Sequence, residues 1–332
     1  MSILMHPAVL IDLVQAGQRG LPLSRDPKFR QELQVCREWG FKLQTTTDHV
    51  RLDFDQDQLV PGWIQNETPP IAWERLEVKG FLRLTSTNSE ALELARQGLP
   101  SGTLVFAEEQ TMGRGRNHRT WISPAGAGLY CTLILRPKQP PKNWPLLTLA
   151  AAIALVDTLK DFSDCEVLPA PLDIDIKWPN DVLLTGKKCA GILLESLLNE
   201  AGNPAAVVGF GINVRKESVP KHLASEAISL EEMTHTRVPR RLILVRFLYF
   251  FQICYLAFEQ GKHPELLERW KSYSSMWNGV PVWIGEGEMR RQAVTCGLNE
   301  IGALLVRTTD GTVQTLYAES IRIPGNLKAK YT

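Results

Sequence analysis

The chain has 332 residues, with 37 basic and 36 acidic side chains, a formal net charge of +1 and 44% hydrophobic residues. This composition is typical of a globular protein and excludes a disordered or fibrous one. The near-zero charge argues against a globally basic nucleic-acid binder. At about 100–200 residues per domain, the length predicts two or three domains.

No segment predicts a membrane span or a secretory signal. The most apolar run, 247–258, is shorter than the ~20 residues that a bilayer needs, and we expect a buried helix there. The amino-terminal residues lack the basic start and cleavage site of a signal peptide. The 6 cysteines and 6 histidines are scattered, without metal-ligand spacing. We therefore expect a cytoplasmic protein with free thiols, no structural metal and no membrane contact.

Residues 1–60 predict a small module of helices and a hairpin. Apolar spacing predicts helices over 9–14 and 28–39, and alternation over 41–52 predicts the hairpin. This order is typical of a winged helix. Proline and glycine in 61–74 predict a linker.

Residues 75–275 mix helical and strand periodicity. Helices are expected after Ser86 and over 144–159, 242–258 and 264–273; strands are expected over 103–107, 129–135, 174–178, 189–194 and 205–208. Short turns separate the strands, which predicts an α+β fold, a mixed sheet with helices on one face. From 276 to 332, short strands over 280–284, 291–295, 303–307, 312–316 and 320–323 predict a small barrel.

The densest polar cluster is the loop Glu109–Trp121, where Arg114, Arg116 and Arg119 are interleaved with Gly113 and Gly115. Arginine offers a planar fork of donors to phosphate or carboxylate, and glycine permits close backbone approach. The residues alone leave two interpretations open, an anion clamp or a solvated basic loop. Trp121 is a stacking surface or a packing residue. The chain has no Walker phosphate-binding loop.

A second cluster, Lys177-Trp-Pro-Asn-Asp181, ends a predicted strand. Alternation puts Ile174, Ile176 and Trp178 on one face, so Asp175 and Lys177 share the other. Such a lysine is either part of a surface ion pair or a fixed charge that neutralises developing anions.

Two further motifs have ordinary structural interpretations. Ser86-Thr87-Asn88 is expected to cap a helix, with ligand binding as the alternative. Gly209 and Gly211, before Asn213, permit close approach to a ligand or form a bulge. No nucleophilic triad can be assembled, and His118 is interpreted as incidental.

Taken in this order, the motifs resemble those of the biotin protein ligases. The resemblance covers 84–322 and rests on Ser86-Thr87-Asn88, Gln110 with Gly113–Arg116 and Trp121, Lys177–Asp181, Lys187–Glu195 and Gly209–Asn213. It implies a class II synthetase-like catalytic domain over 75–275, an SH3-like barrel over 276–332, and a winged-helix-like module over 1–60, degenerate in this chain.

The resemblance also implies a two-step reaction. Biotin and ATP, with Mg²⁺ on the nucleotide, give biotinyl-5′-AMP, and biotin then passes to a lysine of a carboxylase biotin carrier domain. By position, Lys177 and Arg116 would be catalytic. Biotin would contact Ser86, Thr87, Asn88, Gln110, Arg114, Gly115, Arg116 and Lys177. The nucleotide would contact Gly113, Arg114, Arg116, Arg119, Trp121, Asn180, Lys188 and Asn213. No protein metal ligand is assigned.

The chain departs from the family pattern at Thr85, where an acidic residue is expected, and at Asn117-His118, which replaces a more basic or smaller pair. The amino-terminal module is also a poor electrostatic footprint for DNA. Through Leu52 it has seven basic and five acidic residues, and Asp53, Asp55 and Asp57 make the sum negative. We expect a structural module that does not bind DNA. A homodimer formed at a sheet edge is left open.

Three alternatives remain beside the ligase. A lipoate–protein ligase shares the superfamily, but Lys177–Asp181 and the Gly113–Arg116 loop favour biotin. A biotin-sensing transcription regulator would need a DNA-binding module, which the charge disfavours. A binding protein without turnover is disfavoured by Lys177.

Overall fold

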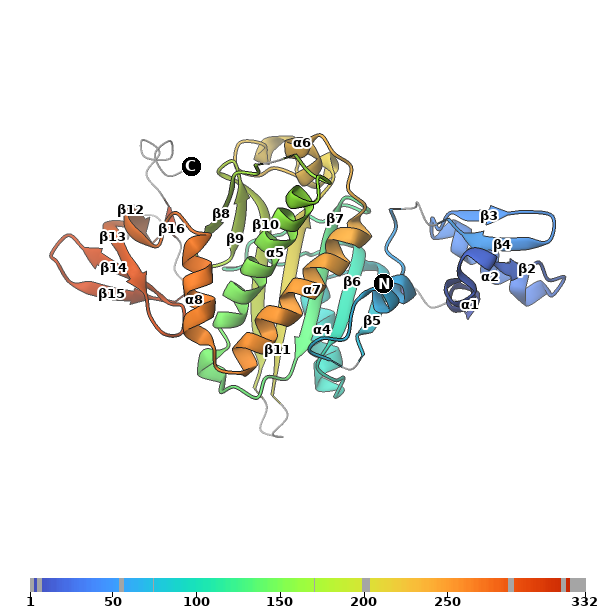
Figure 1. Cartoon of the computed structure of the whole chain (residues 1–332), viewed down its shortest axis with the longest axis horizontal. Coiled ribbons are helices and arrows are strands. Elements are labelled where there is room, and N and C mark those ends of the chain that lie inside the picture. Colours follow the sequence, from blue (N-terminus) through green and yellow to red (C-terminus); the bar gives the residue numbers. More distant parts are fainter. Residues whose placement is uncertain are drawn as a thin grey trace.

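The computed structural model describes residues 3–4, 8–53, 57–73, 75–169, 171–198, 204–285, 290–317 and 321–322. Within these residues, a central eight-stranded sheet has the order β1-β5-β6-β7-β11-β10-β9-β8 (Figure 1). Its strands are β1 (Ile3–Leu4), β5 (Glu77–Leu84), β6 (Thr103–Gln110), β7 (Gly128–Leu135), β8 (Ile174–Lys177), β9 (Asp181–Leu184), β10 (Lys187–Leu197) and β11 (Ala205–Asn213). Strands β5 and β6 are parallel and their neighbours pair antiparallel, so the predicted mixed sheet is confirmed.

Helices cover both faces of this sheet. On β6, Leu104 and Phe106 belong to the main apolar core, which includes α5 (Leu146–Asp164), α7 (Arg240–Glu259) and α8 (His263–Ser272). The alternate residues Val105 and Ala107 pack instead with α4 (Thr87–Arg96). The helix expected after Ser86 is therefore present as α4, but it covers the opposite face, so the prediction of helices on one face is wrong for this helix. This helix needs only a narrow stripe of small apolar residues, a weak sequence signal.

Helix α7 is long and apolar enough, by length and composition, to cross a membrane. In the structure it packs against α5, and the ring centroids of Phe247 and Phe210 on β11 are 4.2 Å apart. Phe247 and Phe251 are buried. The predicted buried helix over this segment is confirmed.

The amino-terminal module contains α1 (Ala8–Ala16), α2 (Pro27–Glu38) and a three-stranded sheet of β2 (Leu21–Pro22), β3 (Leu43–Thr45) and β4 (His49–Leu52). The predicted linker is wrong in its first half, because residues Pro61–Glu67 form helix α3. Pro61 occupies the first turn, where its missing N–H costs nothing. Trp63 and Ile64 of α3 are buried, so the segment is part of the core.

The carboxyl-terminal sheet lies at the opposite end of the long axis from the amino-terminal module (Figure 1). In the described part of the chain it is antiparallel, with β12 (Asn278–Ile284), β13 (Arg291–Leu298), β14 (Leu304–Thr308), β15 (Val313–Leu316) and β16 (Ile321–Arg322). The remainder of the last predicted strand lies outside the described residues, and closure into an SH3-like barrel stays a prediction. A short helix, α6 (Leu230–Thr234), precedes α7.

Phe247→Ala is expected to lower the free energy of unfolding by about 3–5 kcal/mol, because it removes a fully buried ring and leaves a cavity. Urea denaturation followed by circular dichroism measures the loss. Ile253→Ala, at a 36% exposed position of the same helix, should cost less than about 1 kcal/mol. Equal losses in the two variants would contradict the packing of α7.

Candidate active site

A cavity of about 690 Å³ opens on the α4 side of the central sheet. Its walls come from the start of α4, the loop after β6, and strands β8, β10 and β11. Of the residues predicted for the site, the following line it: Ser86, Thr87, Asn88, Gln110, Arg114, Gly115, Arg116, Arg119, Trp121, Lys177, Asn180, Lys188 and Asn213. Gly113 is the exception. The structure thus brings together residues that are spread over more than a hundred positions.

The loop 113–121 folds as a tight hairpin at the cavity. The Gly115 N–H donates to the Arg119 carbonyl at 2.7 Å, and Arg114 pairs with Thr120. Asn117 and His118 form the tip with φ angles of 51° and 59°. Two left-handed residues in succession suit a hairpin turn, and asparagine tolerates them better than most residues. The departure from the family pattern at these two positions therefore coincides with the turn itself.

Two loop arginines each contact a polar side chain from β10, from α4 or from the turn between β8 and β9. Arg114 forms an ion pair with Glu195 on β10 and donates to Ser89 Oγ at 3.1 Å. Arg116 Nη1 donates to Asn180 Oδ1 at 3.3 Å. The guanidinium groups are therefore held at the cavity by the protein.

Glycine shapes the floor of the cavity under Trp121. A Cβ atom on Gly211 would lie 2.5 Å from Trp121 Cε2, and one on Gly191 would lie 3.1 Å from Trp121 Cζ3. The Lys188 Nζ atom lies 5.3 Å from the centroid of the same ring. Gly113 lies so close to the Trp121 carbonyl that a side chain there would clash. The close approach predicted at Gly211 is therefore confirmed, but the group that approaches this glycine is the Trp121 ring and not a ligand. Trp121 itself lines the cavity.

The start of α4 forms a buried polar cluster. The Thr87 N–H and hydroxyl donate to Gln110 Oε1 at 2.8 and 3.1 Å, and Gln110 Nε2 donates to Ser123 Oγ at 2.9 Å. Ser86 stands at the N-cap position, but its side chain makes no capping hydrogen bond. The predicted cap is wrong in this respect, since the Ser86 side chain lines the cavity instead.

Asn88 uses its whole amide within the protein. Its Oδ1 accepts from Thr132 Oγ1 at 2.7 Å, and its Nδ2 donates to the Leu193 carbonyl at 3.2 Å and to Glu195 Oε2 at 2.9 Å. Asn88 therefore orients Glu195, the partner of Arg114.

Strand β8 confirms the predicted alternation. Ile176 is buried in the core, whereas Asp175 and Lys177 line the cavity. Trp178, which follows the strand, is buried and also borders the cavity. Asp175 accepts from the Ser275 N–H at 2.9 Å and from its hydroxyl at 2.6 Å. Burial raises the pKa of Asp175, and these hydrogen bonds only partly offset the effect.

Several lining residues carry no sequence signal of their own. Cys131 lies within an apolar strand, and burial raises its pKa, so the thiol stays protonated rather than acting as a nucleophile. Arg290 and Ile321 reach the cavity from the carboxyl-terminal sheet, and Ser218–Pro220 reach it from the turn after β11. No local periodicity links these segments to the loop.

The lining of the cavity combines uncharged polar side chains with several cations. Ser86, Thr87 and Gln110 offer hydrogen bonds at one wall. Arg114, Arg116, Arg119, Lys177, Lys188 and Arg290 supply positive charge. Such a cavity can hold a neutral polar head group beside a carboxylate and a polyphosphate.

Comparisons with known proteins agree with this chemistry. The model of the biotin/lipoate A/B protein ligase family matches residues 80–213. A biotin–[acetyl-CoA-carboxylase] ligase of Paracoccus denitrificans is 48% identical over 69% of this chain and 93% of that protein. The bifunctional ligase/repressor BirA of Salmonella typhimurium is 32% identical over 90% of this chain and 89% of its own. A solved biotin protein ligase of Aquifex aeolicus, in complex with biotin and ATP, has a TM-score of 0.62 and 27% identity, over 74% of this chain and 99% of that one.

Gly211→Ala is expected to displace Trp121 and loosen the loop, because the added methyl group would lie 2.5 Å from the indole ring. Trypsin should then cut after Arg116 and Arg119 several-fold faster, roughly in proportion to the open population. Mass spectrometry of timed digests measures this. Gly191→Ala, with its nearest neighbours at 3.1 Å, should have a smaller effect. Identical cleavage rates in Gly211→Ala and the unaltered protein would exclude this role of the glycine floor.

Proposed function

The chain belongs to the biotin protein ligases, within the biotin/lipoate A/B protein ligase family, and we propose on that premise that it activates biotin with ATP and transfers it to a carboxylase biotin carrier domain. The observation that carries the proposal is the placement of Lys177 in one cavity with the loop arginines and with Ser86, Thr87 and Gln110. Among the relatives, the Aquifex aeolicus ligase was solved with biotin and ATP.

In the first step, an oxygen of the biotin carboxylate attacks the α-phosphorus of ATP. The bond to pyrophosphate breaks, and biotinyl-5′-AMP forms. Negative charge spreads over the phosphoryl oxygens, so positioning and electrostatic stabilisation supply most of the catalysis. Lys177, on the cavity face of β8, is the fixed cation for that charge.

In the second step, the ε-amine of the acceptor lysine attacks the acyl carbon of the adenylate. The new amide bond forms as AMP leaves, and the amine loses a proton to solvent. The adenylate is a mixed anhydride that water can hydrolyse. The hairpin 113–121, most of whose residues line the cavity, would exclude water until the acceptor arrives.

The side chains divide between the two substrates. We assign Ser86, Thr87 and Gln110 to the biotin head group and Arg114, Gly115, Arg116 and Lys177 to its carboxylate. We assign Gly113, Arg114, Arg116, Arg119, Trp121, Asn180, Lys188 and Asn213 to the nucleotide. Gly113 would act through the loop, since it does not itself line the cavity. Asn88 would act by holding Glu195. Mg²⁺ would enter with the nucleotide, bound chiefly through its phosphates.

A lipoate–protein ligase is the second candidate, because the family model covers both activities. Pyrophosphate–ATP exchange with biotin, with lipoate and with neither separates them. Exchange with biotin alone supports the proposal, and exchange with lipoate reassigns the chain. The absence of exchange from folded protein would make it a binding protein without turnover.

A biotin-sensing transcription regulator is the third candidate, favoured by relatives that are named ligase/repressor. Against it stands the low charge of the amino-terminal module, and we propose that residues 1–60 are structural. For the catalytic domain, predicted over 75–275, we propose a start before Asp57, because α3 lies in its core and Asp57 pairs with Arg215 and Arg240. We also propose the SH3-like barrel at 276–332 and a cytoplasmic location. Salt-sensitive binding to promoter DNA, measured by fluorescence anisotropy, would overturn the structural role. Analytical ultracentrifugation would reveal a homodimer.

Lys177→Ala is expected to keep the fold and to lower kcat/KM for biotin-dependent exchange by about 100-fold or more, because a cation at the developing charge is lost. Lys142→Ala, at an exposed lysine outside the cavity, is the matched control and should exchange normally. Normal exchange by Lys177→Ala would reject the assigned role.

Arg116→Gly is expected to form the adenylate and release it, because the hydrogen bond from Arg116 to Asn180 is lost. Filter binding of radiolabelled biotinyl-5′-AMP should show a dissociation rate roughly tenfold faster than that of the unaltered protein. Unchanged retention would mean that this arginine does not hold the loop.

A further inference from the structure

We propose that Asp57, in the segment between the amino-terminal module and α3, is a positioning residue for the nucleotide side of the cavity. The proposal rests on the proposed function, because that function places ATP beside Asn213. Asp57 does not itself line the cavity. Its effect would pass through Arg215 and the turn that follows it.

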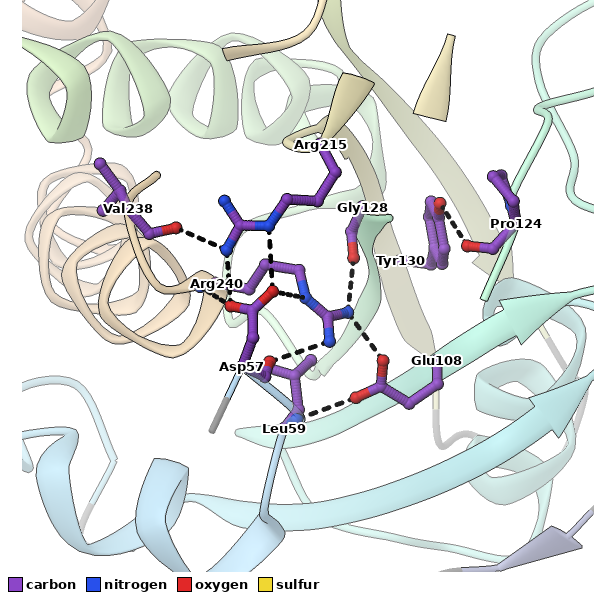
Figure 2. Close-up of polar contacts among 9 residues, drawn as sticks. All are labelled: Asp57, Leu59, Glu108, Pro124, Gly128, Tyr130, Arg215, Val238 and Arg240. Carbon is purple, nitrogen blue, oxygen red and sulfur yellow. Dashed lines mark hydrogen bonds and ion pairs between the residues drawn. The ribbon is translucent and has the colours of Figure 1, made fainter. Parts of the chain in front are cut away.

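Asp57 joins two arginines from distant parts of the chain (Figure 2). Arg215 donates to its carboxylate from Nε at 3.0 Å and approaches it with Nη2 at 2.7 Å. Arg240 donates from its backbone N–H at 2.9 Å and from Nε at 3.2 Å. Glu108 completes the cluster, with its Oε2 at 2.7 Å from Arg240 Nη1. The two negative charges of Asp57 and Glu108 thus balance the two positive charges of Arg215 and Arg240.

This balance matters because the cluster is buried. Arg215, Arg240 and Glu108 are only 4%, 2% and 6% exposed. Burial alone would lower the pKa of Arg240, but Glu108 and Asp57 outweigh it and the pKa is raised. A buried charge that loses its partner is strongly unfavourable. Without the Asp57 charge, Arg215 is expected to shift toward water.

Arg215 is connected directly to the cavity wall. Its carbonyl accepts from the Ser218 N–H at 2.9 Å and from the Ser218 hydroxyl at 2.6 Å, which closes the turn after β11. Ser218, Val219 and Pro220 line the cavity, and Asn213 lies two positions before Arg215. A shift of Arg215 therefore moves the wall that adjoins Asn213.

The same segment also holds the amino-terminal module. Gln58 Nε2 donates at 2.8 Å to the Trp39 carbonyl at the end of α2, whereas the Leu59 N–H donates at 2.8 Å to Glu108 Oε1. Gln58 therefore contacts the amino-terminal module, and the next residue, Leu59, contacts the central sheet. The segment connects the two, and Asp57 contacts Arg215, whose carbonyl holds the cavity-lining residue Ser218.

Asp57→Asn tests the proposal in the full chain, since it keeps the shape of the side chain and removes the charge. In biotin-dependent pyrophosphate exchange, the KM for ATP should rise roughly tenfold, while the KM for biotin stays within about twofold. Asp161→Asn is the matched control. Asp161 also accepts two hydrogen bonds from one arginine, Arg246, and is 22% exposed against 24% for Asp57, yet neither Asp161 nor Arg246 lines the cavity.

A merely structural role for Asp57 would lower the thermal midpoint and leave both KM values unchanged, as expected for Asp161→Asn. If Asp57→Asn fails to fold, Arg215→Lys decides, because it keeps the buried positive charge outside the cavity, loses the two-point contact with Asp57 and should raise the KM for ATP several-fold. An unchanged KM for ATP in the folded variants would overturn the proposal. That outcome is distinct from failure of the proposed function, which would abolish biotin-dependent exchange in the unaltered protein.

Discussion

The geometry of the site depends on three glycines of strands β10 and β11 that border the cavity. Gly191 and Gly211 leave room for the Trp121 ring to lie against the sheet, and Gly209 leaves room for Asn88. Trp121 ends the arginine loop, and Asn88 holds Glu195, the partner of Arg114. The position of the loop therefore follows from the absence of Cβ atoms on two neighbouring strands. Larger residues there would fill the cavity with protein.

Two cations that line the cavity, Arg114 and Lys188, form weak ion pairs within the protein. Arg114 pairs with Glu195 at 42% exposure of the arginine, and Lys188 pairs with Asp181 at 33% exposure of the lysine. Ion pairs this exposed contribute little to stability, typically about 0–1 kcal/mol. Exchanging such a partner for a phosphate oxygen costs little, while the pairing keeps each side chain near its working position before the substrate binds.

Sequence patterns predicted the elements whose signal is local. Alternation placed Asp175 and Lys177 on the cavity face of β8, and the apolar run 247–258 gave a buried helix. Strands β5 and β9 were missed: β5 mixes charged and apolar residues, and β9 is only four residues long between two turns. Residue type alone could not decide whether the arginines of the loop 113–121 bind an anion or form a solvated basic loop. The family resemblance, which fixes motif order over most of the chain, decided that point.

What the patterns could not supply is pairing across the chain. Asp57 and Arg215 are 158 positions apart, and nothing in the periodicity around either residue indicates the other. From the sequence, Asp57 was counted with the acidic charge of the amino-terminal module. In the structure its carboxylate pairs instead with Arg215, which follows β11, and with Arg240 of α7. The predicted boundary at residue 60 runs through this ion cluster. A fragment that begins at Pro61 would keep Arg215, Arg240 and Glu108 but lose one of the two carboxylates. It would therefore bury an unbalanced positive charge beside the cavity wall. On electrostatic grounds the amino-terminal limit of the catalytic unit lies before Asp57.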